Sequence, residues 1–273
     1  MSPIKRLGGR DAQRGTEAEY LSPGRFDGKI AVVTGAGSGI GRATARRLAA
    51  EGASVACLDV AEDNAKATVA DIEGAGATVP SAAYHCDVTN EGSVERTVER
   101  VAAELGAPNV VCNVAGIGGF AHSTEQSLEG WNRIIAVNLT GTFLVCRATL
   151  PHLLVSGGSI TNVISTAGVM GQPFSAAYCA SKGGAAMLTR ALAVEYLESD
   201  VRVNGVAPGG VDTPLVHDFG FPEGASFKAF ERIMTPKGYC TPAEIASAIA
   251  FIASDEAAYA TGAILSIDGG LST

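Results

Sequence analysis

Positive charge is scarce in this sequence. Its 20 lysines and arginines are outnumbered by 28 aspartates and glutamates, which gives the 273 residues a formal net charge of -8. A protein that binds nucleic acid or an anionic membrane surface needs a basic face, so the composition excludes both kinds of partner. No apolar run approaches the roughly 20 residues of a membrane-spanning helix.

Recurring patterns of metal ligands are also missing. The six cysteines form no C-x-x-C pair and the four histidines form no H-x-x-x-H pair, so we expect no metal site. Several cysteines stand inside apolar segments, where a thiol acts as a small buried hydrophobe in a reducing compartment. We therefore expect a cytoplasmic protein.

The start of the chain has little hydrophobic periodicity and lacks the apolar segment of a secretory signal. It is rich in arginine, glycine, glutamate and serine, and we expect residues 1–26 to form a flexible N-terminal tail. The alternative is a charged arm that docks on a neighbouring subunit. The remaining residues, 27–273, are expected to form one domain.

Short β-branched or apolar segments alternate with helical ones along the rest of the chain, and 47% of the residues are hydrophobic. Strands that are apolar on both faces and separated by helices are typical of a parallel sheet covered on both sides. The sequence therefore predicts a single doubly wound α/β domain with a seven-stranded parallel sheet and helices on both faces. The expected strands cover residues 29–34, 54–59, 82–87, 109–114, 158–164, 201–206 and 263–267, and the expected helices cover 40–51, 61–74, 93–105, 128–154, 176–198 and 242–253.

A glycine-rich turn follows the first expected strand and reads Thr34-Gly35-Ala36-Gly37-Ser38-Gly39-Ile40-Gly41. Ile40 breaks a G-x-G-x-x-G spacing, and the turn fits T-G-x-x-x-G-x-G instead. Between a strand and a helix, such a turn brings backbone N–H groups against a pyrophosphate at the helix N-terminus. A purely structural turn is the alternative. The expected dinucleotide contacts are Gly35, Ser38, Gly39, Ile40 and Gly41.

Asp59 ends the second expected strand, close to the distance of about 20 residues at which an acidic residue binds the ribose of a dinucleotide. A carboxylate there accepts hydrogen bonds from ribose hydroxyls and repels a 2′-phosphate. Ser38 and Val60 flank the site without an arginine or lysine that could neutralise such a phosphate. These residues favour NAD over NADP. The alternative is that Asp59 caps the following helix.

Tyr178 and Lys182 are four residues apart near the start of an expected helix, so both project from the same face. Any helix offers such a pair, so its interpretation depends on other residues. Ser165 closes the fifth expected strand, at the edge where open α/β sheets bind ligands. Asn138 stands in the long helix among residues suited to burial, where its amide needs a partner; a satisfied core asparagine is the alternative.

These motifs together resemble the short-chain dehydrogenase/reductase family, in its shorter single-domain form with a Rossmann fold. The resemblance extends from Phe26 to the end of the chain. It departs from the family at Val114, where a second asparagine is usual, and this departure bears on the hydrogen bonds that brace the turn. The matching motifs are the glycine-rich turn, Asp87-Val88, Asn113-Val114-Ala115-Gly116, Asn138, Ser165, Tyr178-x-x-x-Lys182 and Pro208-Gly209-Gly210-Val211-Asp212-Thr213.

The resemblance implies a homotetrameric NAD-dependent oxidoreductase of alcohols and ketones. It makes Tyr178 the general acid/base and Lys182 the cation that lowers the pKa of Tyr178 while binding the nicotinamide ribose. Ser165 holds the substrate oxygen, and Asn138 anchors a water of a proton relay. The further cofactor contacts that it implies are Asp87 and Val88 to the adenine, Asn113, Ala115 and Gly116 to the ribose, and Pro208, Gly209, Val211 and Thr213 in the motif after the sixth strand.

The stretch 213–241 is irregular and apolar, and it occupies the position of the substrate lid in that family. With Phe120, Met170 and Phe174 facing it, this lid suggests a hydrophobic or cyclic secondary alcohol or ketone as substrate. The alternative is that these side chains only pack the lid against the domain or another subunit. Two other functions stay open: a 3-oxoacyl thioester reductase, which would use the same four catalytic residues, and a non-catalytic NAD-sensing protein.

Overall fold

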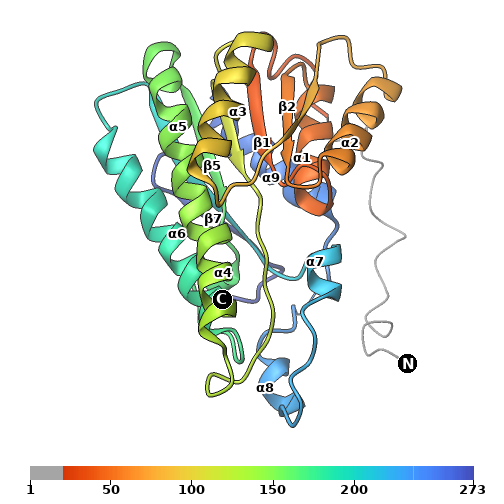
Figure 1. Ribbon diagram of the computed structural model, residues 1–273, viewed down its shortest axis with the longest axis vertical. Coiled ribbons are helices and arrows are strands. Elements are labelled where there is room, and N and C mark those ends of the chain that lie inside the picture. The colour runs from red at the N-terminus through yellow and green to blue at the C-terminus, as the bar shows by residue number, and fades with distance from the viewer. Residues whose placement is uncertain (1–20, 236) are drawn as a thin grey trace.

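The computed structural model describes residues 21–235 and 237–273. A seven-stranded, all-parallel sheet runs through the molecule in the order β3-β2-β1-β4-β5-β6-β7, and it confirms the predicted fold class (Figure 1). The strand order reverses between β1 and β4, and such a switch point is where open α/β sheets bind their ligands. The strands are β1 (Ile30–Thr34), β2 (Ser54–Asp59), β3 (Ala82–His85), β4 (Val110–Asn113), β5 (Gly158–Val163), β6 (Val201–Pro208) and β7 (Ile264–Ile267).

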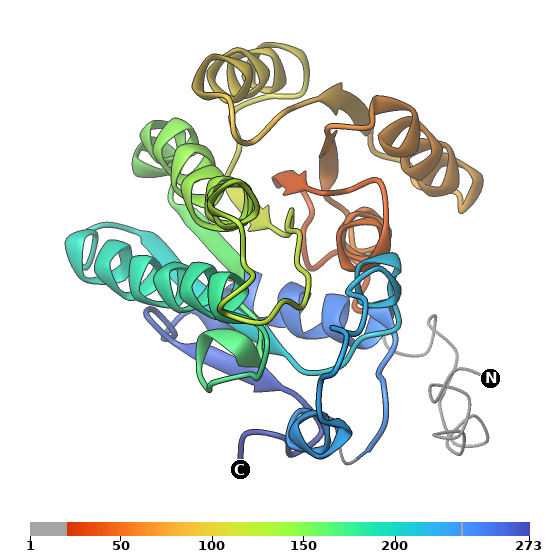
Figure 2. The same cartoon turned by 60° about the horizontal axis from the view of Figure 1, so that its bottom comes forward.

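Helices cover both faces of this sheet (Figure 2). In β1, Val33 faces one apolar cluster and its neighbour Val32 faces another, because successive side chains of a strand point to opposite faces. One cluster packs under α1 (Gly39–Ala50), α2 (Glu62–Gly74) and α9 (Pro242–Ala253), and the other under α3 (Glu91–Glu104), α5 (Gly141–Ser156) and α6 (Ala176–Glu195).

The long helix expected over residues 128–154 is interrupted. It consists of α4 (Leu128–Ile135), a π-helical turn (Ala136–Thr140) and α5 in direct succession. The whole stretch Leu128–Ser156 is long and apolar enough, by composition alone, to cross a membrane, which the sequence analysis did not expect. Half of its most apolar part is buried within the structure, as in a helix of a protein core. The π-helical turn surrounds Asn138, and such turns frequently mark functional sites.

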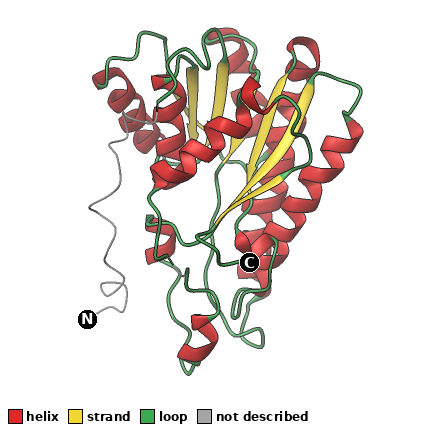
Figure 3. Cartoon of the chain, turned by 180° about the vertical axis from the view of Figure 1, so that it is seen from behind, coloured by secondary structure: helices red, strands yellow, loops and turns green. Residues whose placement is uncertain are grey.

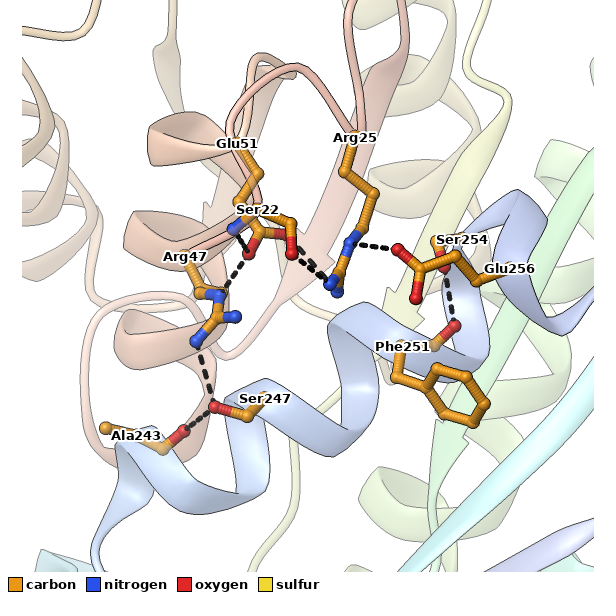
Figure 4. A network of polar contacts seen from close by, with 9 residues as sticks. All are labelled: Ser22, Arg25, Arg47, Glu51, Ala243, Ser247, Phe251, Ser254 and Glu256. Carbon is orange, nitrogen blue, oxygen red and sulfur yellow. Dashed lines mark hydrogen bonds and ion pairs between the residues drawn. The ribbon is translucent and has the colours of Figure 1, made fainter. Parts of the chain in front are cut away.

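The predicted N-terminal tail is wrong at its end, while its residues 1–20 lie outside the described part of the chain. Phe26 is only 1% exposed and belongs to the core beside α1 and α9. Arg25 and Arg47 flank the fully buried carboxylate of Glu51 at 3.5 and 2.6 Å (Figure 4). A buried carboxylate needs such cationic partners, so residues 21–26 are part of the folded domain.

Between β6 and α9 the chain leaves the sheet in a segment made mainly of loops, with the short helices α7 (Pro214–His217) and α8 (Phe227–Glu231) (Figure 3). The two ends of this segment are joined. The backbone N–H of Cys240 donates to the Gly210 carbonyl, and the N–H of Asp212 donates to the Cys240 carbonyl, both at 2.9 Å. The segment therefore departs from the sheet and returns to it at the same point.

Candidate active site

A cavity of about 540 Å³ opens at the carboxyl ends of the strands, at the switch point between β1 and β4. Every residue that the sequence assigns to cofactor binding lines this cavity, with the exception of Asn113. Three of the four predicted catalytic residues line it too, and Asn138 does not. The predicted residues in the wall are Gly35, Ser38, Gly39, Ile40, Gly41, Asp59, Val60, Asp87, Val88, Ala115, Gly116, Ser165, Tyr178, Lys182, Pro208, Gly209, Val211 and Thr213.

The glycine-rich turn is packed too closely to admit side chains. A Cβ atom on Gly41 would lie 2.0 Å from the carbonyl oxygen of Gly35. Gly35 itself has a φ of +64°, and a Cβ there would lie 2.8 Å from the Cα atom of Ala115. Because α1 begins at Gly39, the unpaired N–H groups of its first turn lie at the cavity. This cradle fits the pyrophosphate of a dinucleotide.

Asp59 is held at the cavity wall by two backbone groups. Its Oδ2 atom accepts a hydrogen bond from Gly37 N, and its Oδ1 atom accepts one from Ala61 N, each at 2.9 Å. The second bond lies at the start of α2, so a helix-end role coexists with the position in the cavity wall. Each carboxylate oxygen has further lone pairs with which it can accept hydroxyl donors. The residues therefore fit the adenosine ribose of NAD.

Asn113 is absent from the cavity wall because its side chain points into the core. Nδ2 donates to Oδ1 of Asn162 at 2.8 Å and lies 3.3 Å from Sγ of Cys146. The sequence motif places Asn113 at the end of a strand. It contains no signal for the face of the sheet on which the amide lies.

The turn after β4 is braced without the asparagine that Val114 replaces. The hydroxyl of Thr34, at the end of β1, accepts hydrogen bonds from the backbone N–H groups of Val114 and Ala115 at 3.0 and 3.1 Å. These bonds join the two strand ends on either side of the switch point. Val114 itself packs against the core and also borders the cavity.

Ser165 and Tyr178 come together at one end of the cavity. Ser165 has a φ of +120°, which strains the backbone of a residue other than glycine, and such strain is common at active sites. Burial raises the pKa of Tyr178, while a hydrogen bond with Ser165 acts in the opposite direction. In the protein alone the effect of burial is the larger, so the phenol holds its proton at neutral pH.

Lys182 lies in the same wall, one helical turn from Tyr178. Its Nζ atom is 5.9 Å from the centroid of the Tyr178 ring and donates to the carbonyl of Val163 at 2.8 Å. Burial lowers the pKa of Lys182 to about 8. In the protein alone the pKa of Tyr178 is raised by burial, so the lowering by Lys182 that the resemblance implies is not seen.

Asn138 acts on the loop that follows β4. Its Oδ1 atom accepts a hydrogen bond from Ile117 N at 2.9 Å, and its Nδ2 atom donates to Ile117 O at 2.8 Å and to the hydroxyl of Ser181 at 3.0 Å. The amide is fully buried and satisfied, as in the core alternative. It also lies close to the cavity, since a Cβ on Gly116 would be 3.3 Å from Asn138 Oδ1 and 3.4 Å from Lys182 Nζ.

A second cavity of about 370 Å³ adjoins the first under the segment 213–241. Ser165 and Tyr178 line both cavities. Among the described residues that line the second cavity, none is Asp, Glu, Lys or Arg. A ligand in it would be surrounded mainly by apolar and aromatic side chains.

Aromatic rings form much of this second cavity. Phe219 meets Tyr178 edge-on with ring centroids 5.4 Å apart, and Phe120 meets both Phe219 and Phe230 at 4.8 and 4.9 Å. Phe174 stacks on Phe230 at 5.2 Å. Phe120 and Phe174 therefore face the segment 213–241 as expected. Met170 is not among the residues that line the cavity.

Some cavity residues were missed by the sequence analysis. Arg133 and Val137 are four residues apart on the helix that contains Asn138. Both line the first cavity, which is called the nucleotide cavity from here on. Their spacing was the available signal, because it places them on one face. Cys86, Thr89, Val114, Ile117, Val163, Ile164, Pro214, Leu215 and Val216 also line it.

Across residues 21–235 and 237–273, no three His, Cys, Asp or Glu side chains gather in a way that could hold a metal ion.

Comparison with known proteins gives consistent matches over nearly the whole chain. A family model described as enoyl-(acyl carrier protein) reductase matches residues 35–272. A cis-4-hydroxycyclohexanecarboxylate dehydrogenase of Sinomonas cyclohexanicum is 44% identical over 250 residues, which cover 90% of this chain and 97% of that protein. A 3-oxoacyl-(acyl-carrier-protein) reductase of Thermotoga maritima is 39% identical over 249 residues, which cover 90% and 99%. The crystal structure of levodione reductase matches with a TM-score of 0.82 and 33% identity, covering 90% of this chain and 98% of that one.

Proposed function

Because the chain belongs to the short-chain dehydrogenase/reductase family, whose dehydrogenases use nicotinamide cofactors, we propose that it is an NAD-dependent oxidoreductase. Its reaction interconverts a secondary alcohol and a ketone by hydride transfer, on a hydrophobic or cyclic substrate. The observation that carries this proposal is that Ser165 and Tyr178 border both cavities. A substrate oxygen held between these two hydroxyls lies beside the cofactor site and within apolar surroundings.

In the proposed mechanism, Tyr178 takes the hydroxyl proton of the alcohol and returns it to the ketone oxygen in the reverse direction. Ser165 orients the substrate oxygen through its hydroxyl. A bound nicotinamide cofactor supplies the hydride acceptor and, when oxidised, a positive charge. Lys182 adds a second positive charge near the phenol, and nearby cations favour the phenolate that burial disfavours. Asn138 holds the loop beside Lys182. Its proposed role there is to anchor a water of the proton relay.

The preference for NAD rests on Asp59. A 2′-phosphate next to this carboxylate would meet a like charge, whereas ribose hydroxyls can donate to it. The basic side chains in the cavity wall are Lys182, beside Tyr178, and Arg133, on α4. Neither flanks Asp59 in the sequence, as a residue that recognises a 2′-phosphate often does.

The apolar second cavity supports a hydrophobic or cyclic substrate, and we propose the segment 213–241 as its lid. The match to a dehydrogenase named for a hydroxycyclohexane compound agrees with this substrate class. A second candidate, reduction of a 3-oxoacyl thioester, is favoured by the match to the Thermotoga maritima reductase. A non-catalytic NAD-sensing protein is disfavoured because Ser165, Tyr178 and Lys182 are all in place.

We also propose a homotetramer in the cytoplasm. Helices α5 and α6 expose apolar side chains that a subunit interface would cover: Phe143, Leu154, Val155, Met187 and Val194. All six cysteines are free, which fits a reducing compartment. Sedimentation equilibrium of the purified protein tests the oligomeric state, and a monomer at micromolar concentration would contradict it.

A substrate screen tests the proposed reaction. Cyclic secondary alcohols, short polyols and a 3-hydroxyacyl thioester are each supplied with NAD and, separately, with NADP, and the reduced cofactor is followed by absorbance. We expect turnover of cyclic alcohols with NAD. Turnover confined to short polyols would contradict the substrate class, and NADP-linked turnover of the thioester alone would favour the second candidate.

A further inference from the structure

The second cavity, called the substrate cavity from here on, has further polar side chains in its wall besides Ser165 and Tyr178. Two of them are His217 and Tyr239, which line the substrate cavity and do not line the nucleotide cavity. Tyr239 also borders a further hollow of about 340 Å³ behind the lid segment. These two residues therefore lie outside the wall that the two cavities share.

Backbone pairing fixes the position of Tyr239. The isolated β-bridge between Val211 and Cys240 holds the residue next to Tyr239 against the chain that leaves β6. The Tyr239 ring lies on Gly210, where an added Cβ would come within 2.8 Å of the ring. The hydroxyl of Thr235, which also borders the cavity, already accepts a hydrogen bond from Gly210 N at 3.0 Å.

Within the described residues, the Tyr239 hydroxyl makes no hydrogen bond to the protein, and the residue is 37% exposed. Burial and the nearby Asp212 carboxylate both raise the pKa of Tyr239, so its phenol keeps its proton and can donate it in a hydrogen bond. The polar atom of Tyr239 is thus available to a ligand.

His217 offers the complementary group. Its Nε2 atom lies 2.9 Å from Oδ1 of Asp212. A neutral imidazole in this pair carries its proton on Nε2, where the carboxylate accepts it, and Nδ1 is then an acceptor. The pair of Asp212 and His217 thus leaves one acceptor in the same cavity wall as the donor of Tyr239. A hydroxyl is a small group that can both donate to the acceptor and accept from the donor.

We propose that Tyr239 and His217 bind a second, non-reacting hydroxyl of the substrate, so that neutral alicyclic diols are preferred over simple cyclic alcohols. This inference rests on the proposed function and names its substrate class. A carboxylate in the same place would meet the negative charge of Asp212 and no lysine or arginine in the cavity wall. A simple alcohol would fill the cavity without the two hydrogen bonds that a second hydroxyl could make to Tyr239 and His217.

The test compares the isomeric cyclohexanediols with the corresponding methylcyclohexanols, in which a methyl group of similar size replaces the second hydroxyl. With NAD and the unmodified protein, the best diol should exceed its methyl counterpart by about 10-fold in kcat/KM, mainly through a lower KM, because two neutral hydrogen bonds distinguish them. In Tyr239→Phe, which retains the ring and removes the hydroxyl, this ratio should fall to about 3-fold or less. Tyr259→Phe, at a fully exposed tyrosine, is the matched control and should keep the ratio of the unmodified protein.

The outcomes separate this inference from the proposed function. Equal kcat/KM values for diols and methylcyclohexanols, or an unchanged ratio in a Tyr239→Phe protein that still melts cooperatively and binds NAD, overturn the role of Tyr239 and leave the proposed reaction standing. Absence of NAD-linked turnover for every alcohol overturns the proposed function and this inference together.

Discussion

At the scale of single residues, burial moves the pKa values of Tyr178 and Lys182 in opposite directions. It raises the pKa of the phenol and lowers that of the ammonium to about 8. Both shifts disfavour the charged form, which is the form that each residue needs in the proposed alcohol oxidation. At neutral pH the phenol is uncharged and only the ammonium carries a charge, so it is the burial of Lys182 that costs stability.

Replacing Lys182 by methionine should reveal that cost. Below pH 8 the lysine is charged in the folded and unfolded states, and its burial reduces stability. Between pH 8 and its ordinary pKa of 10.5, the unfolded chain binds more protons, so the stability of the unmodified protein rises with pH. The pKa difference corresponds to about 3 kcal/mol, and loss of the bond to Val163 offsets about 1 kcal/mol of it.

We therefore expect Lys182→Met to raise the free energy of unfolding at pH 7 by about 2 kcal/mol and to lose this advantage near pH 10.5. Urea unfolding of both proteins at several pH values, without cofactor, measures the difference. Lys228→Met, at an exposed lysine on α8, is the control for a change of charge alone. A pH-independent difference for Lys182→Met would show that the buried charge is not its origin.

Replacing Tyr178 by phenylalanine separates proton transfer from cofactor binding. General acid/base groups contribute about 100- to 10,000-fold, so kcat should fall by that range while the dissociation constant of NAD changes only a few-fold. Steady-state kinetics and calorimetric titration with NAD measure the two quantities. Unreduced kcat in this variant would exclude Tyr178 as the acid/base.

At the scale of elements, the C-terminus of α9 is held by a side chain from a neighbouring strand. The guanidinium of Arg202, on β6, donates to the carbonyls of Ile252 and Ser254 at 3.0 and 2.9 Å, and to those of Ala253 and Ala260 at 3.2 and 3.3 Å. The last carbonyls of a helix lack partners within the helix, and a cation there also complements its dipole. This contact joins α9 to the sheet that it covers.

Arg202→Met should destabilise the protein by about 2 to 4 kcal/mol, because it removes four hydrogen bonds donated by a charged group at a half-buried position. Thermal or urea unfolding gives the value. Arg96→Met, at an exposed position on α3, should stay within about 0.5 kcal/mol of the unmodified protein. Equal losses in the two variants would argue against the capping role.

Some element details depend on contacts that a sequence does not reveal. β3 was expected to reach residue 87 but ends at His85. Asp87 Oδ1 instead accepts hydrogen bonds from the backbone N–H and the hydroxyl of Thr89, and this local turn competes with strand pairing. The π-helical turn around Asn138 was missed for a similar reason, because the apolar spacing of the stretch is typical of an ordinary helix.

At the scale of the whole molecule, binding of NAD should stabilise the folded protein. A ligand at 100 times its dissociation constant adds about 2.7 kcal/mol, which for a domain of this size corresponds to roughly 5 to 10 °C in melting temperature. NADP at the same concentration should give a clearly smaller shift because of Asp59. Differential scanning fluorimetry measures both, and equal shifts would contradict the proposed preference.

The sheet and most of the nucleotide cavity could be predicted from the sequence because they depend on local signals. Gly35, Asp59 and Ser165 each stand at or just beyond the carboxyl end of a strand, and parallel strands bring these ends to one edge. The direction of the Asn113 amide and the position of Arg133 could not be predicted, because they depend on how helices rotate against the sheet. The anchoring of residues 21–26 was missed because it depends on Glu51, which is distant in sequence.

The junction of the two cavities has a consequence for chirality. In the proposed reaction, Ser165 and Tyr178 would hold the oxygen of the substrate and the aromatic cavity would hold the rest of it, so the carbon between them would turn only one of its two faces toward the proposed cofactor site. If one enantiomer of an unsymmetrical alcohol fits in this way, its mirror image directs its hydrogen elsewhere. The reaction of a racemic alcohol should then stop at half conversion and leave one enantiomer unreacted.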